Sequence, residues 1–82
     1  MPNTKVLTPG QCRAARGFLD WTQDELAARA GLSRSTVRDF EKGRHDLHPS
    51  SEQLLVRTLD EAGVLLIPAG DVGPGVCLKR PA

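Results

Sequence analysis

The sequence is poor in aromatic residues. It has no tyrosine, one tryptophan (Trp21) and two phenylalanines (Phe18 and Phe40). A core with so few rings has to be mainly aliphatic. At 82 residues the chain is long enough for one small domain of marginal stability. We therefore expect a single domain over residues 1–82, of a size that often gains stability from a second copy.

Long apolar runs are missing as well, and the first residues, Met1 to Lys5, are polar. A membrane-spanning helix needs about 20 apolar residues, and a secretory signal needs an apolar segment near the start of the chain. We therefore expect no membrane partner and a cytoplasmic protein. The two cysteines, Cys12 and Cys77, match no metal-binding or redox spacing, and we expect two reduced thiols.

Charge of one sign is not in excess, since the net charge is +1 at pH 7. This argues against a protein that coats nucleic acid with a uniformly basic surface. Locally, residues 29–44 carry five basic side chains against two acidic ones, as in a nucleic-acid contact or a solvated helix face. Ser50 and Ser51 have no histidine–carboxylate pair and are interpreted as helix caps, so we expect no enzyme. His45 and His48 have no third ligand nearby, so we expect no metal and no cofactor.

Signals for helix starts and ends recur along the chain. Three segments have the pattern of a capping box, in which side chain and backbone bond reciprocally across the first turn: Thr8–Gln11, Thr22–Glu25 and Ser50–Gln53. Ser33 is a further N-cap candidate. Glycines that can end a helix in a left-handed conformation follow at three places: Gly31, Gly43 and Gly63. Four helices are predicted, over about residues 9–19, 23–30, 34–42 and 51–62.

Apolar residues recur at helical spacing and predict the core. The expected inward residues are Cys12, Ala15, Phe18, Leu19, Leu26, Ala27, Ala30, Leu32, Val37, Phe40, Leu54, Leu55, Leu59 and Ala62. Trp21 precedes a cap and is expected to pack on Leu26 as a hydrophobic staple, although its ring could instead stack on a base. After Gly63 the pattern changes to two short β-type runs, residues 64–67 and 76–79, around a turn-rich segment, which predicts a hairpin.

The two short helices joined by Ala30-Gly31-Leu32 are what a helix-turn-helix requires, because its turn contains glycine and small residues let the helices cross closely. Residues 22–43 resemble the helix-turn-helix of the Cro and phage-repressor type, also called the xenobiotic-response-element family. The shared elements are Gln23-x-x-Leu26-Ala27, Ala30-Gly31-Leu32-Ser33, Val37 and Phe40-Glu41-x-Gly43.

The resemblance extends from about Leu7 to Val64 and implies a mainly α fold. We expect a four-helix repressor-like helix-turn-helix core over about residues 7–63, followed by a short C-terminal β-hairpin or β-strand tail over about residues 64–80. The tail departs from the five-helix phage repressors, because no fifth helix follows Gly63.

The resemblance also implies roles for individual residues. Those expected to read bases are Ser33, Arg34, Ser35, Arg38 and Asp39. Those expected to contact phosphate are Thr22, Gln23, Lys42, Gly43, Arg44 and His45. The guanidinium of Arg34 matches the O6 and N7 atoms of guanine, with a phosphate contact as the alternative. Arg16 and Glu41 match a buried ion pair of the family, with a surface position for Arg16 as the alternative.

These features predict a sequence-specific double-stranded DNA-binding transcriptional regulator, associated with the nucleoid. It is most simply a repressor that acts as a homodimer on a near-palindromic operator. The residues expected in the dimer interface are Leu59, Val64, Leu65, Leu66, Val76, Cys77 and Leu78. The alternative is a hairpin that folds back on its own helices in a protein that dimerises only on DNA. A different class of function is a protein-interaction module, an antitoxin or antiactivator, which an exposed apolar tail would favour.

Overall fold

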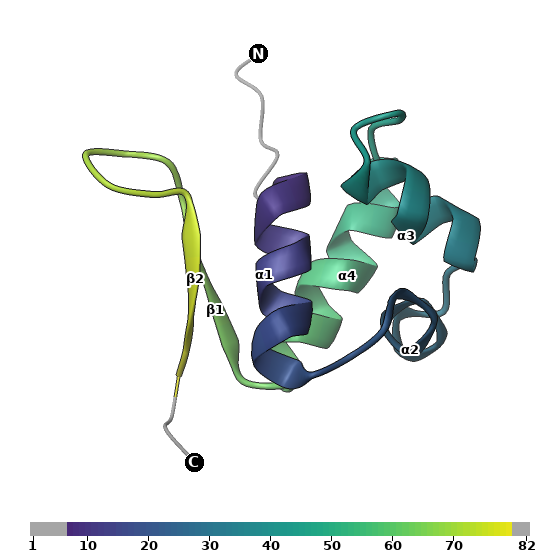
Figure 1. Ribbon diagram of the computed structural model, residues 1–82, viewed down its shortest axis with the longest axis horizontal. Coiled ribbons are helices and arrows are strands. Elements are labelled where there is room, and N and C mark those ends of the chain that lie inside the picture. The colour runs from purple at the N-terminus through teal and green to yellow at the C-terminus, as the bar shows by residue number, and fades with distance from the viewer. Residues whose placement is uncertain (1–6, 80–82) are drawn as a thin grey trace.

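The computed structural model describes residues 7–79, and within them the chain forms four helices followed by a two-stranded hairpin (Figure 1). The helices are α1 (Pro9–Leu19), α2 (Gln23–Ala30), α3 (Arg34–Glu41) and α4 (Pro49–Glu61), and the strands are β1 (Val64–Ile67) and β2 (Gly75–Leu78). The predicted mainly α architecture is therefore confirmed, with the strands within one residue of their expected positions.

Two of the three predicted capping boxes are confirmed, and the third is wrong. The reciprocal bonds are present in Thr8–Gln11 and in Thr22–Glu25. Ser50–Gln53 forms no box, because α4 begins earlier, at Pro49, with His48 as an N-cap whose side chain makes no capping bond. Proline suits the first helical position and disfavours a helical conformation for the residue before it, so Pro49 decides where this helix starts.

The buried core joins all four helices to β1. The largest fully buried side chains are Leu26, Leu55, Leu59, Val37, Val64 and Cys12. Full burial of one such aliphatic side chain contributes about 1.5–3 kcal/mol. Leu7 and Leu47, which flank helices and escape a search for helical periodicity, complete this core.

Two residues that were expected in the core are exposed, Phe18 and Leu54. Phe18 lies three positions after the buried Ala15, at the margin of the inward face of α1, and Leu54 directly precedes the fully buried Leu55. Helical spacing predicts a stripe of residues, but the neighbouring elements decide how wide a part of that stripe they cover.

The hairpin lies beside α1, on the side away from α2 and α3 (Figure 1). Its antiparallel register pairs Val64 with Leu78 and Leu66 with Val76 on one face, and Leu65 with Cys77 on the other. β1 packs on α4 and β2 packs on α1, with Leu66 and Val76 against the core. The hairpin therefore folds back on its own helices, as one of the two arrangements weighed above requires.

Gln11 fastens the hairpin to α1. Its side chain is buried, and Oε1 accepts the capping bond from the Thr8 amide while Nε2 donates to the carbonyls of Ile67 (2.9 Å) and Gly75 (3.0 Å). These two carbonyls belong to the last residue pair of the hairpin, next to its turn. The side-chain amide of Gln11 therefore caps the N-terminus of α1 and also binds the turn end of the hairpin. At the other end of the hairpin, the backbone amide of Lys79 donates to the carbonyl of Gly63, which joins the end of β2 to the start of β1.

Candidate nucleic-acid interface

The angle between α2 and α3 is set by a three-residue turn. Gly31 ends α2 with φ 75°, a left-handed conformation that suits glycine. The Leu32 amide then donates to the carbonyl of Ala27 (2.8 Å), and the side chain of Ser33 accepts from the Thr36 amide to begin α3. These bonds fix the conformation of the turn, so α3 leaves α2 in a defined direction.

α3 has one buried side and one free side. Val37, Phe40 and Glu41 are buried, whereas Arg34, Ser35 and Arg38 are exposed. The residues expected to read bases therefore lie on the exposed side of α3, and Asp39 lies half-buried at its margin. A helix held from behind with polar side chains in front is what major-groove recognition requires.

Arg34 is engaged in a contact that the sequence did not indicate. Its Nη1 lies 3.4 Å from Oδ2 of Asp24 on α2, with side chains 66% and 62% exposed. An ion pair in this position contributes little, because water screens both charges. Arg34 can therefore leave Asp24 for a base edge at small cost.

The residues expected to contact phosphate form two groups. Thr22 and Gln23 are at the start of α2, while Lys42, Gly43, Arg44 and His45 follow α3 and are all exposed. The Gln23 amide donates from Nε2 to Oε1 of Glu41 (3.0 Å), which places the first residue of α2 beside the last residue of α3. One Nε2 proton and the hydroxyl proton of Thr22 remain able to bind an anion at this helix N-terminus.

Arg16 and Glu41 form an ion pair with two parallel hydrogen bonds. Nε of Arg16 donates to Oε2 of Glu41 (2.9 Å) and Nη2 donates to Oε1 (2.8 Å). The Glu41 side chain is only 1% exposed and that of Arg16 is 20% exposed. Arg16 therefore lies mostly inside the protein, and not at the surface position that was the alternative. Because α1 supplies the arginine and α3 the glutamate, the pair attaches the end of α3 to α1.

Several donors stabilise the charge of Glu41. Burial alone would raise the pKa of this carboxyl, but hydrogen bonds from Arg16, Gln23 and Cys12, with the charge of Arg16, outweigh it and leave the pKa below its ordinary value. For Cys12 the effect is opposite: burial, and then the hydrogen bond and charge of Glu41, raise the thiol pKa. Cys12 is consequently a neutral donor to the network and a poor nucleophile.

Arg13 is a member of this network that sequence reasoning missed. Its Nη1 donates to the backbone carbonyl of Glu41 at the end of α3. The available signal was its position three residues before Arg16, which places the two guanidinium groups on neighbouring positions of α1. α1 thus binds both the side chain and the backbone of Glu41.

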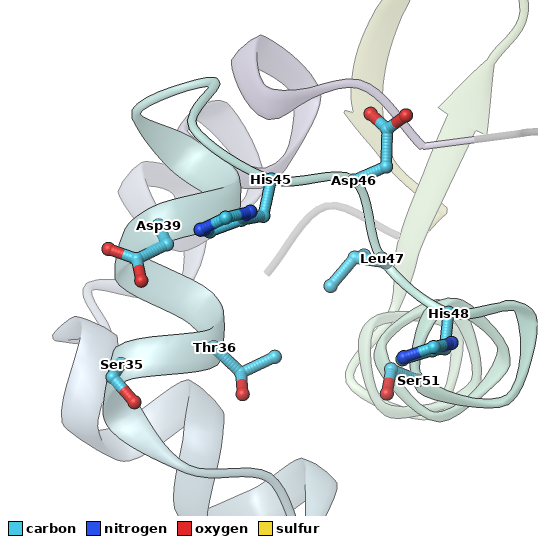
Figure 2. A pocket seen from close by; sticks show the side chains of 8 residues that line it. All are labelled: Ser35, Thr36, Asp39, His45, Asp46, Leu47, His48 and Ser51. Carbon is cyan, nitrogen blue, oxygen red and sulfur yellow. The ribbon is translucent and has the colours of Figure 1, made fainter.

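A hollow of about 320 Å³ lies beside the free side of α3, between that helix, the following loop and the start of α4 (Figure 2). It is lined by Ser35, Thr36, Asp39, His45, Asp46, Leu47, His48 and Ser51. The hollow contains two imidazoles and two carboxylates. Even so, no group of three or more His, Cys, Asp or Glu side chains within residues 7–79 is suitably placed for a metal ion.

The set of residues expected at a dimer interface has to be narrowed. Leu59 and Val64 are buried within the chain's own core, so they have no free surface for a second copy. Leu66, Val76 and Cys77 are half-buried. The tail residues with substantial free surface are Leu65, 47% exposed, and Leu78, 38% exposed. The sequence pattern does not reveal this difference, because all seven residues are apolar.

Comparison with known proteins agrees with this geometry. A family model described as helix-turn-helix matches residues 13–61, which run from the first turns of α1 to the end of α4. A comparison with curated proteins finds no match. Among the described helices, none is both long and apolar enough to cross a membrane.

Proposed function

The chain belongs to the helix-turn-helix family of the Cro and phage-repressor type, and on this premise we propose that it recognises a specific double-stranded DNA sequence through α3. One observation carries the proposal: α3 exposes Arg34, Ser35 and Arg38, while Val37 and the Arg16–Glu41 pair fix its other side. In this arrangement the recognition helix needs little rearrangement to enter the major groove.

In the complex, the base-reading contacts come from the first turns of α3. Arg34 binds the O6 and N7 atoms of a guanine, and Ser33, Ser35, Arg38 and Asp39 contact adjacent base edges. Phosphates on one side are bound by the start of α2, through Thr22 and Gln23, and on the other by residues 42–45. The basic side chains and free amides of these groups provide affinity without reading sequence.

We propose further that the protein acts as a homodimer on a near-palindromic site and represses transcription by occupying a promoter in the nucleoid. One helix-turn-helix reads only a few base pairs, so selectivity in a genome needs two half-sites, about 34–36 Å apart. Leu65, 47% exposed on the hairpin face turned away from the core, supplies apolar surface for contact between copies, and Leu78, 38% exposed on the other face, adds to it at the end of β2. A closed two-fold contact would cover this surface on both copies at once.

The test of recognition starts with selection of bound sequences from a random DNA pool. Fluorescence anisotropy on the selected duplex and on a scrambled duplex then compares two variants. Arg34→Ala should lose about 1–3 kcal/mol on the selected duplex and much less on the scrambled one. Arg44→Ala should weaken both alike and reduce the salt dependence.

Equal losses on both duplexes for Arg34→Ala would make this residue a phosphate contact. A pool that enriches no sequence, with no binding to random DNA, would refute DNA recognition and favour the protein-interaction alternative. The dimer is tested by sedimentation of the combined variant Leu65→Ser with Leu78→Ser, with Val72→Ser in the exposed hairpin turn as the control. If the combined variant and the wild type sediment alike as dimers, these residues are not the dimer contact.

A further inference from the structure

Asp24 and Arg34 join the first turns of the two helices of the helix-turn-helix. Asp24 is the second residue of α2, and Arg34 is the first residue of α3. Nη1 of Arg34 donates to Oδ2 of Asp24 over 3.4 Å, and both side chains are more than half exposed. Within residues 7–79 the guanidinium makes no other hydrogen bond. In the proposed complex, Asp24 lies between the phosphate-binding start of α2 and the base-reading start of α3.

The bond to Asp24 leaves most of the guanidinium free. Arginine has five N–H donors, and bidentate binding of the O6 and N7 atoms of guanine needs two of them. With Nη1 on Asp24, the edge formed by Nε and Nη2 is open. Arg16 divides its donors in the same way, because Nε and Nη2 bind the oxygens of Glu41 while Nη1 donates to the carbonyl of Trp21. Arg34 is therefore able to bind Asp24 and a guanine at the same time.

The contact with Asp24 restricts a long side chain before DNA arrives. Ordering such a side chain on binding reduces affinity, and a contact that restricts it in the free protein reduces this cost. In the free protein the contact is weak, because water screens both charges. DNA displaces part of this water, which strengthens the attraction between Asp24 and Arg34. The guanidinium is therefore held more firmly in the complex than in the free protein.

The negative charge of Asp24 allows orientation to be separated from simple electrostatics. A carboxylate beside the phosphate-binding start of α2 repels DNA, so its removal alone should strengthen binding to every sequence. If Asp24 orients Arg34, its removal should weaken binding where a guanine is read. Glu25 is a matched acid in the same turn, whose carboxylate accepts from the Thr22 amide and has no bond to Arg34.

We propose that Asp24 is a positioning residue for sequence reading: it holds Nη1 of Arg34 so that Nε and Nη2 meet the O6 and N7 atoms of a guanine. The proposal rests on the proposed function, since it requires that α3 meets DNA bases. In this role an acidic residue that contacts no base contributes to base selectivity. The recognised site then contains a guanine at the first turn of α3.

The experiment measures dissociation constants for the selected and the scrambled duplex by fluorescence anisotropy. The preference for the selected duplex, taken as the ratio of the two constants, should fall about three- to tenfold in Asp24→Ala, as loss of one orienting contact allows. Binding to the scrambled duplex should stay equal or tighten. Asp24→Asn keeps an uncharged acceptor and should give an intermediate preference. Thermal melting of Asp24→Ala should be close to that of the wild type, because an exposed pair contributes little to stability.

Two controls show whether Asp24 acts through Arg34. Glu25→Gln removes a charge but keeps an acceptor for the capping bond, so it should tighten both duplexes alike. In an Arg34→Ala background, Asp24→Ala should no longer lower the preference. Substitution of 7-deazaguanine, which lacks the N7 acceptor, at each guanine of the selected duplex identifies the base that is read. Its cost at that base should be smaller in Asp24→Ala than in the wild type.

The outcomes separate this role from DNA recognition itself. An unchanged preference in Asp24→Ala, or a fall that persists in the Arg34→Ala background, overturns the proposal while DNA recognition stands. A selected duplex without guanine overturns it in the same way. Absence of binding by the wild type to any sequence overturns both.

Discussion

Replacement of Glu41 by alanine should destabilise the protein strongly. Glu41 accepts two hydrogen bonds from Arg16 and one from Gln23, and its side chain is almost completely buried. Glu41→Ala removes the acceptor and leaves a guanidinium inside the protein with one remaining bond, from Nη1 to the carbonyl of Trp21.

The expected loss follows from these contacts. Breaking a buried pair by removing one partner costs about 3–5 kcal/mol. Since the Arg16 side chain is 20% exposed, water can reach part of the guanidinium, and we expect the lower end of that range, about 3 kcal/mol. A chain of 82 residues has a total stability of roughly 4–12 kcal/mol. The melting temperature should therefore fall by roughly 12–24 °C.

Thermal unfolding followed by circular dichroism measures this fall. Glu61→Ala is the control, because Glu61 is an exposed residue at the end of α4. A double variant, Arg16→Met with Glu41→Leu, removes both charges and should recover much of the loss, since an apolar pair often replaces a buried ion pair without cost. The reasoning is refuted if Glu41→Ala melts like Glu61→Ala, or if the double variant is as unstable as the sum of its single changes.

Three further predictions concern acid, the hairpin and the thiols. Folding lowers the pKa of the Glu41 carboxyl, so the stability that this charge contributes is complete above the ordinary glutamate pKa of about 4.3. That stability is lost as the pH falls through the lowered pKa of the folded protein. In thermal melts from pH 6 to 2, acid should therefore destabilise the wild type more steeply than Glu41→Gln. Gln11→Leu removes the bonds to both hairpin carbonyls and should lower stability by about 2 kcal/mol, with hydrogen exchange accelerated in β1 and β2 more than in α3; unchanged exchange in the strands would contradict the role given to Gln11. An aromatic disulfide reagent should label the half-buried Cys77 rapidly and the fully buried Cys12 only on unfolding, and equal rates would contradict the described packing.

The sequence alone determined the features that depend on neighbouring residues. Capping bonds reach across a single turn, so Thr8 and Thr22 mark the starts of α1 and α2 independently of how those helices pack. The positive φ of Gly31 is likewise a local requirement of the turn. Resemblance to a family, rather than local physics, supplied the partnership between Arg16 and Glu41, which are 25 residues apart.

Tertiary structure decided which surfaces are covered. Phe18 and Leu65 have the same apolar character as Val64, but only Val64 is enclosed, because burial depends on which elements pack nearby and not on the residue itself. Gln11 was predicted as a local cap, and its second role appeared only when the hairpin placed two carbonyls, more than 50 residues along the chain, within reach of its free amide nitrogen. A capping pattern predicts one hydrogen-bond partner of a side chain. The partners of its remaining donors and acceptors depend on which groups the tertiary structure places beside it.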